Sequence, residues 1–367
     1  MRQSAARPPG DPRPPAPAGR HHGWLGRQID TLYPGSFALV MATGIISNAF
    51  YFEGMHGISE VLFDINVAAY AWLIAATAAR LVRAPRALWA DLTSPQLTFA
   101  FFTLVAATDV LGFGILVRGH EGLALSMWAA ALGLWVVLIY LSFGVLIFLN
   151  TAHGANVVHG GWLIAIVGTQ SLVVLGTQVA PAAGSAAPTI FVLIHMLWGV
   201  GLALYGIFIV LFAQRVFFID VAPDDITPLL WVVMGAAAIT TNAGAMLILT
   251  DSRLPYLHAM RPFIDGVTLI AWAWATFWIP LLVLFGLWKH GACRVPLRYT
   301  PMLWSLVFPL GMFALASLRL SLAAGVPLLR VLSQGMVWIA LAAWIATAMG
   351  LAWSVAQSLR ASARVTS

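Results

Sequence analysis

Hydrophobic residues in this chain gather in ten long blocks, separated by short breaks that contain polar residues, glycine or proline. The approximate blocks are 33–52, 62–83, 95–117, 123–149, 161–180, 188–214, 228–250, 263–288, 301–322 and 330–358. Each is near or above the about 17–25 residues that a helix needs to cross the hydrocarbon core of a bilayer. The pattern therefore predicts an all-α integral membrane protein with ten transmembrane helices.

The composition agrees with lipid as the main solvent of the chain. Of its 367 residues, 61% are hydrophobic and 9% are charged, whereas a soluble domain has about 45–50% apolar and about 25% charged residues. This excludes a cytosolic enzyme, a nucleic-acid module and a secreted disulfide scaffold. A net charge of +6 would suggest a nucleic-acid partner in a soluble protein. Here the basic residues are scattered between the blocks, so we expect the lipid bilayer, and no nucleic acid, as a partner.

Three regions follow from this pattern. Residues 1–27 form a Pro/Arg-rich tail, expected to be disordered, residues 28–360 form the membrane domain, and residues 361–367 form a short C-terminal tail. If the N-terminus is cytoplasmic, that side receives fourteen basic residues and the other side five. The positive-inside rule then predicts a multi-pass protein of the inner (plasma) membrane, with both tails in the cytoplasm.

The odd-numbered blocks look like copies of one unit. They begin at 33, 95, 161, 228 and 301, and four of these starts carry a proline: Pro34, Pro95, Pro228 and Pro301. Residues 227–231 (TPLLW) and 300–304 (TPMLW) are nearly identical. Proline is favoured at the first helical position, and a preceding threonine can cap the helix. Any membrane helix can begin with Thr-Pro, but the regular spacing favours a helical hairpin repeated five times around a shared axis.

The odd-numbered blocks are also richer in glycine and polar residues than the even-numbered ones. Examples are Asn48, Ser171 and Asn242. Small residues allow close helix packing wherever they occur. Their concentration in one phase of the repeat favours a shared interior.

Two motifs resemble a known family. Residues 33–47 (YPGSFALVMATGIIS) resemble the opening motif of the tellurite-resistance/C4-dicarboxylate transporter family, and residues 304–317 (WSLVFPLGMFALAS) resemble its ninth-helix motif. The superfamily includes slow-type anion channels, malate permeases of the malic acid transport protein family and sulfite exporters. The resemblance implies five hairpins in a pseudo-fivefold arrangement around a central pore, and a homotrimer. It also implies the passage of small anions, either inorganic or C4-dicarboxylates such as malate.

The resemblance further implies that a phenylalanine of the ninth helix obstructs the pore. By motif position this is Phe308, directly before Pro309, with Phe313 as the alternative. Pro309 lies inside its block, where it removes a backbone hydrogen bond. The resulting kink faces either a water-filled cavity or packed protein. An apolar ring can close a narrow pore by dewetting. One departure from the family motif is Ala38 after Phe37, where some channel members have glycine.

We expect residues of the odd-numbered blocks to line the pore: Pro34, Phe37, Ala38, Met41, Thr43, Gly44, Phe102, Asp109, Thr169, Gly235, Thr240, Gly311 and Arg319. Asp109 and Arg319 are the ionisable groups placed deepest in these blocks. Intramembrane charges are candidates for function, and we expect the two to pair. A purely structural salt bridge, or snorkelling of Arg319 to the outer interface, is the alternative.

The sequence contains no evidence for an enzyme, a cofactor or a metal. Cys293 is the single cysteine, and His195 is the one histidine well inside a block, so neither a disulfide nor a two-histidine haem site is expected. His153 and His159 have poor spacing for a metal site, and we expect them to be loop residues. Metalloprotease, P-loop and α/β-hydrolase motifs are absent.

Helix dipoles favour an anionic substrate. The odd helices are expected to place their N-termini, which carry partial positive charge, at the cytoplasmic mouth. Nearby loops add Arg80, Arg83, Arg86, Arg294 and Arg298. The alternative function is a proton-coupled dicarboxylate carrier or a sulfite- or tellurite-related exporter, whose flux would depend on pH through Asp109. A membrane redox subunit is a weaker alternative.

Overall fold

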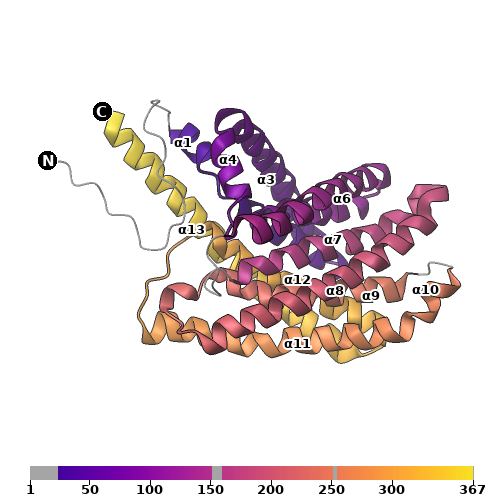
Figure 1. The fold of residues 1–367 in the computed structure, drawn as a ribbon. Helices are drawn as coiled ribbons and strands as arrows, with labels where there is room; N and C mark the ends of the chain where they lie inside the picture. Colours follow the sequence, from indigo (N-terminus) through magenta and orange to yellow (C-terminus); the bar gives the residue numbers. More distant parts are fainter. Residues whose placement is uncertain (1–23, 151–158, 251–253, 367) are drawn as a thin grey trace.

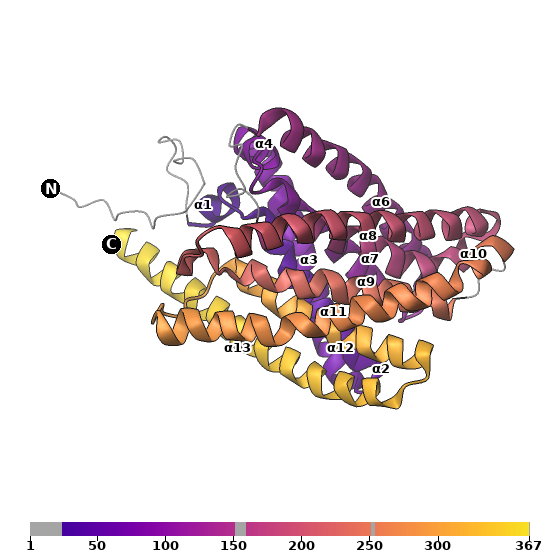
Figure 2. The same cartoon turned by 60° about the horizontal axis from the view of Figure 1, so that its bottom comes forward.

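The structure is a computed structural model, and it describes residues 24–150, 159–250 and 254–366. The described residues form helices and connecting turns, without a strand. Most of the predicted N-terminal tail lies outside the described residues, but α1 (Trp24–Asp30) crosses its expected boundary. Figures 1 and 2 place α1, the short helix α4 (Pro85–Leu92) and the C-terminal end of α13 toward one end of the molecule, and α10 (Pro255–Ala259) at the other.

Nine helical segments in the described part of the chain are long and apolar enough to cross a membrane. The longest, Gly160–Phe218, has 59 residues. A straight helix of that length would measure about 90 Å, three times the about 30 Å of a hydrocarbon core. Gly184 interrupts it with φ 57° and ψ −119°, a conformation that glycine adopts readily. The interruption separates α7 from α8 and coincides with the break predicted between blocks 161–180 and 188–214.

Five helices make a closed circuit of contacts at the centre of the fold. They are α2 (Ala38–Phe52), α5 (Phe102–Leu116), α7 (Ile164–Val179), α9 (Val232–Leu249) and α12 (Trp304–Ala324). Each packs against the next, and α12 packs against α2. Nearly all of their side chains are buried. We call these five the inner helices.

Five longer helices, here called the outer helices, pack against the inner ones. They are α3 (His56–Arg83), α6 (Glu121–Gly144), α8 (Ala187–Phe218), α11 (Arg261–Leu287) and α13 (Pro327–Thr366). They expose large apolar side chains such as Tyr140 (76% exposed) and Phe218 (83% exposed). Lipid is the solvent for which such a surface is suited. α13 continues past residue 360, the expected end of the membrane domain.

Every inner helix begins with a turn of 3₁₀-helix. These turns are Pro34–Phe37, Thr98–Phe101, Gly160–Leu163, Pro228–Trp231 and Pro301–Leu303. Three of the four predicted prolines begin such a turn, whereas Pro95 lies three residues before Thr98, in the preceding turn. The expectation that threonine caps two of them is wrong: neither Thr227 nor Thr300 makes a side-chain cap. Their backbone carbonyls instead accept from the N–H groups of Leu230 and Leu303, because a 3₁₀ turn bonds three residues ahead.

An aromatic hydrogen bond joins each outer helix to an inner one. The five bonds are Tyr70 Oη–Thr108 Oγ1 (2.9 Å), Trp135 Nε1–Thr169 Oγ1 (2.8 Å), Trp198 Nε1–Thr240 O (3.4 Å), Trp272 Nε1–Ser317 Oγ (2.9 Å) and Trp344 Nε1–Thr43 Oγ1 (2.8 Å). The partner is in each case the next inner helix along the chain, and α13 returns to α2. Hydrogen bonds between helices hold membrane proteins together where the hydrophobic effect cannot. The same link therefore recurs five times around the fold.

Close packing of α9 on α12 is expected to depend on Gly235. A Cβ atom added there would lie 2.7 Å from Cγ of Pro309, and the proline ring cannot move aside as a flexible side chain would. We expect Gly235→Ala to destabilise the fold by about 1–3 kcal/mol, the range for overpacking. Gly199→Ala, on α8 with nothing within 4 Å of the added atom, is the matched control. Thermal unfolding in detergent should show a lower apparent Tm for the first variant alone, and equal values would contradict this packing.

Candidate functional site

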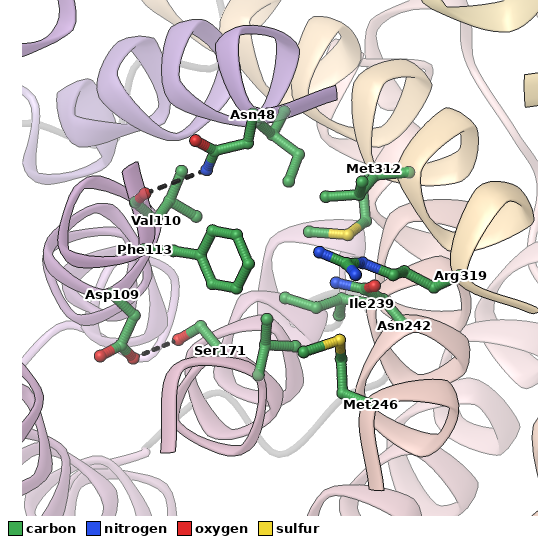
Figure 3. A pocket seen from close by; sticks show the side chains of 13 residues that line it. Asn48, Asp109, Val110, Phe113, Ser171, Ile239, Asn242, Met246, Met312 and Arg319 are labelled. Carbon is green, nitrogen blue, oxygen red and sulfur yellow. Dashed lines mark hydrogen bonds between the residues drawn. The ribbon is translucent and has the colours of Figure 1, made fainter. Parts of the chain in front are cut away.

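The inner helices enclose one small cavity to which all five contribute, here called the chamber (Figure 3). Its lining residues are Ile45, Asn48, Asp109, Val110, Phe113, Ser171, Val174, Ile239, Asn242, Met246, Met312, Leu315 and Arg319. The space open to the centre of a water molecule is about 20 Å³, enough for one water or a similarly small ion. The chamber is therefore a site for a small species.

The repeat places the chamber at one depth in all five helices. The eleventh residue after the start of each 3₁₀ turn lines it, and these residues are Ile45, Asp109, Ser171, Ile239 and Met312. At 1.5 Å per residue this is about 16 Å along the helix, close to half of a hydrocarbon core of about 30 Å. The repeated units thus meet near the middle of the predicted membrane span.

Two walls of the chamber carry ionisable groups, an acid on one and a base on the other. On one side, Oγ of Ser171 donates to Oδ2 of Asp109 at 2.7 Å. On the other side, Figure 3 shows the Arg319 guanidinium beside the Asn242 amide, with the Phe113 ring between the two walls. Cζ of Arg319 lies 3.9 Å from the centre of the Phe52 ring, a cation–π contact. Asp109 on α5 and Arg319 on α12 therefore both line the same cavity, and the Asp109 carboxylate turns toward Ser171 (Figure 3).

Several polar atoms around the chamber lack a protein partner. They are Oδ1 of Asn48, Asp109 and Asn242, and Nε of Arg319. The Asn48 amide group donates to the carbonyl of Val110 at 3.2 Å. Buried polar groups are nearly always hydrogen-bonded in native proteins. In the described part of the chain, further unpartnered buried atoms lie away from the chamber, on Asn66, Gln170, Thr268 and Trp278. The four at the chamber mark it as a place that can accommodate a polar species.

The expected ion pair between Asp109 and Arg319 is not formed in the described part of the chain. The carboxylate uses Ser171, and the guanidinium stacks on Phe52. The physical reason is that each group meets a partner on an adjacent helix, while Phe113 occupies the space between them. The prediction that Asp109 and Arg319 lie at one site is confirmed, and the prediction that they form an ion pair is wrong.

Phe308 lies one turn closer to the start of α12 than the chamber. It precedes the lining residues Met312 and Leu315 by four and seven positions, which puts all three on one helix face. On each of the other inner helices, one residue likewise precedes two lining residues by four and seven positions. These residues are Met41, Ala106, Val167 and Gly235. All five are buried. Helical geometry thus forms an apolar layer with a single aromatic ring on the side of the chamber nearer the helix starts.

Phe313, the alternative gate residue, contacts an outer helix. Its ring stacks on Trp272 of α11, with centroids 5.9 Å apart and an interplanar angle of 21°. Residue 313 is also well rotated around α12 from the face that carries Met312, Leu315 and Arg319. This geometry favours Phe308 over Phe313 as the residue that faces the axis.

Other residues predicted to line the pore contact neighbouring helices. The hydroxyls of Thr43 and Thr169 accept from outer-helix indoles, and the Thr240 carbonyl does the same. A Cβ on Gly44 would meet Asn66 and Val110, and one on Gly311 would meet Ile45 and Ile46. Phe37 meets Tyr70, the Pro34 carbonyl accepts from Thr103, and Phe102 lies against Gly168. Ala38 and Met41 are buried. Their role in lining a pore stays a prediction.

A larger cavity of about 250 Å³, here called the vestibule, lies where inner helices begin. Tyr33, His159, Leu229 and Met302 are among its lining residues. Burial raises the pKa of Tyr33 to about 12. Burial also lowers the pKa of His159, and the hydrogen bond of its Nε2 to the Gln96 carbonyl partly opposes this. Its Nδ1 accepts from the N–H of Gly161 at 3.0 Å, which fixes the neutral ring in place. His153 lies outside the described residues.

Two of the arginines expected to attract anions near this end are already paired. Arg80 is buried, bonds Asp91 at 2.7 Å and also donates to the carbonyls of Asp30 and Leu32. Arg83 pairs with Asp30 at 3.1 Å. The positive charge of these two side chains is therefore balanced locally.

Sequence reasoning missed Asn48, Phe113, Ser171 and Asn242 as site residues. Three of them had been recognised as polar residues of the inner helices, which was the available signal. What the sequence did not provide was the rotation of each helix, which decides whether a polar residue faces the chamber or a neighbouring helix.

Long apolar helices around a buried polar chamber are typical of proteins that move solutes across membranes. The sequence pattern of the voltage-dependent anion channel family matches residues 31–352. The chain belongs to this family of multi-pass membrane channels and transporters, which are not enzymes, and the resemblance seen in the two motifs is confirmed.

Three relatives show how widely the similarity extends. An uncharacterized membrane protein of Mycobacterium tuberculosis is 38% identical over 155 residues, which cover 42% of this chain and 78% of that protein. An uncharacterized transporter of Methanocaldococcus jannaschii is 25% identical over 320 residues, covering 85% and 91%. A sulfite efflux pump of Arthroderma otae is 23% identical over 331 residues, covering 83% and 84%.

Removing the hydroxyl of Ser171 should destabilise the fold. Asp109 would lose its hydrogen bond while staying buried, at a cost of about 1–3 kcal/mol. Ser126→Ala is the control, because the Ser126 hydroxyl is exposed and bonds only within its own helix. We expect Ser171→Ala to lower the apparent Tm in detergent and Ser126→Ala to leave it unchanged. Equal Tm values would show that the hydrogen bond to Asp109 contributes little.

Proposed function

We propose that this protein passes small anions, inorganic or C4-dicarboxylates such as malate, along the axis between the inner helices. The observation that carries the proposal is the chamber: five repeated helices surround it at one depth, and it holds Arg319 behind an apolar layer that contains Phe308. Membership of the voltage-dependent anion channel family also supports a negatively charged substrate.

The proposed route begins at the vestibule. Inner helices start there, and the positive ends of their dipoles attract an anion. The described lining also contains Asp224 and Asp225, the latter paired with Arg215 at 3.0 Å, so the attraction is weak. Arg319 then supplies the one fixed cation of the described chamber lining. Conduction requires binding that is strong enough for entry and weak enough for exit, and a single cation with a nearby carboxyl meets that requirement.

The proposed gate is the ring of Phe308. Its layer is apolar, and small residues from α5 and α9 oppose the ring, so a rotation of one side chain would change the width of the passage. Pro309 has no backbone N–H, so the carbonyl one turn earlier in α12 lacks its usual hydrogen bond. This part of α12 is therefore easier to deform. The burial of Phe308, which is only 2% exposed, supports a closed passage in this proposal.

The proposed architecture is the one that the repeat predicts: five hairpins in pseudo-fivefold order around a central pore. The five aromatic bonds support it, because each links an outer helix to the next inner helix in a closed circuit. A homotrimer in the inner membrane with both termini in the cytoplasm completes the proposal, on family expectation and the distribution of basic residues.

A proton-coupled carrier is the second candidate. Similarity to a sulfite efflux pump and the carboxyl of Asp109 inside the chamber both favour it. Coupling would be seen as flux that saturates with substrate and responds to pH. Because flux through the passive pathway can also respond to pH, saturation separates the two modes. Flux on reconstituted protein is measured against concentration for chloride, nitrate, sulfite and malate, which also ranks the substrates.

Removing the ring of Phe308 should open the passage. We expect Phe308→Ala in liposomes to raise anion flux several-fold, because the apolar layer would lose its one aromatic group. Phe313→Ala is the control: it removes an equally large ring that stacks on Trp272 instead, and it should reduce thermal stability without raising flux.

Either of two outcomes would contradict the gate. A folded Phe308→Ala variant with the flux of the unmodified protein would remove Phe308 from the gate. Increased flux in Phe313→Ala alone would assign the gate to the alternative position. Monodisperse elution in detergent identifies variants that are folded.

A further inference from the structure

The described lining of the chamber contains one carboxyl and one guanidinium, held apart. Asp109 bonds Ser171 on α7, while Arg319 stacks on Phe52 with Nε unpartnered. A structural salt bridge would bring the two into contact, as Arg80 and Asp91 do at 2.7 Å. Here Phe113 lies between them. The separation leaves the guanidinium free to meet an anion.

Charge balance links the two groups. With both ionised and nothing bound, the described lining is neutral. An anion beside Arg319 would then leave one excess negative charge in a buried cavity, where charge is poorly solvated. Protonation of Asp109 removes that excess and turns its carboxyl into a donor. Because linkage is reciprocal, a bound anion must favour the proton and the proton must favour the anion.

We propose that the chamber is a proton-linked anion site, in which Arg319 and the Asn242 amide hold a small monovalent anion and Asp109 takes up one proton with it. This proposal rests on the proposed anion pathway and adds a form of regulation to it: a lower pH favours binding of the anion in the chamber. No covalent bond changes, since the proton comes from water and returns to it. A chamber of about 20 Å³ is suited to an anion of the size of chloride and would have to expand for malate.

The other groups around Asp109 do not provide a competing proton site in the described structure. From α3, Tyr70 approaches, and its hydroxyl bonds that of Thr108 at 2.9 Å. From α7 the neighbour is Ser171, and from α2 it is Asn48, neither of which ionises. Across the chamber stands Arg319. Asp109 is thus the acid whose charge changes most directly with the anion.

Chloride flux into liposomes, measured between about pH 5.5 and about pH 7.5, tests the linkage. The unmodified protein should gain flux on acidification, by at most about tenfold per pH unit, the limit for one proton. Asp109→Asn keeps the group that accepts from Ser171 but cannot ionise. Its flux should be independent of pH and equal to the acidic level of the unmodified protein.

A control and a contrary outcome make this test decisive. Glu60→Gln removes an acid that is half exposed and paired with Arg118, so this variant should keep the pH dependence of the unmodified protein. If Asp109→Asn keeps that dependence too, the proposal is overturned. The same holds if flux in the unmodified protein does not change with pH.

A binding measurement tests the site independently of transport. Chloride added to protein in weakly buffered detergent should draw protons from solution, seen with an indicator dye, toward one proton per chloride bound. Asp109→Asn and Arg319→Gln should take up none, and Glu60→Gln should match the unmodified protein. Uptake by Asp109→Asn equal to that of the unmodified protein would overturn the proposal. Absence of chloride flux with normal proton uptake would instead reject the conduction pathway and leave the binding site.

Discussion

Lipid offers no hydrogen-bond partners, and this constraint acts on every polar group within the described membrane-spanning helices. Backbone groups are satisfied within helices, and the interruption at Gly184 divides a segment too long to be a single crossing. Many hydroxyls bond a carbonyl one turn earlier in their own helix. Other polar side chains bond a neighbouring helix, as the aromatic links from outer to inner helices do, and stabilise the bundle. A third group lines the chamber and forms the candidate site.

The repeat turns this constraint into an architecture. Inner helices that start with the same 3₁₀ turn and contact each other in a closed circuit bring equivalent positions to the same depth. Asp109, Ser171 and Met312 occupy one repeat position, yet they contribute an acid, a hydroxyl and a thioether. A symmetric scaffold thus surrounds an asymmetric site. One wall can hold negative charge and another positive charge, as a pathway for ions requires.

In the proposed function, closure and binding fall to adjacent layers of the same helices. The Phe308 layer is apolar, and the chamber one turn further on adds five polar or ionisable residues to an otherwise apolar lining. A narrow apolar layer excludes ions by dewetting, while polar groups behind it lower the cost of holding an ion. Close approach of α9 and α12 at Gly235 and Pro309 packs the two helices tightly at the Phe308 layer.

The sequence by itself determined the membrane class, the positions of the apolar helices, the recurring proline starts and the family, because these depend on hydropathy and local spacing. It also brought Asp109, Arg319 and Phe308 to attention as unusual residues in apolar surroundings. Only the tertiary structure decided which faces of the inner helices meet: it turned Thr43 and Thr169 toward outer-helix indoles, placed Phe313 on Trp272, and separated Asp109 from Arg319. The physical reason is that the inner helices are apolar nearly all around, so their sequences carry almost no amphipathic signal. Their rotation is fixed by packing against neighbours far away in the chain.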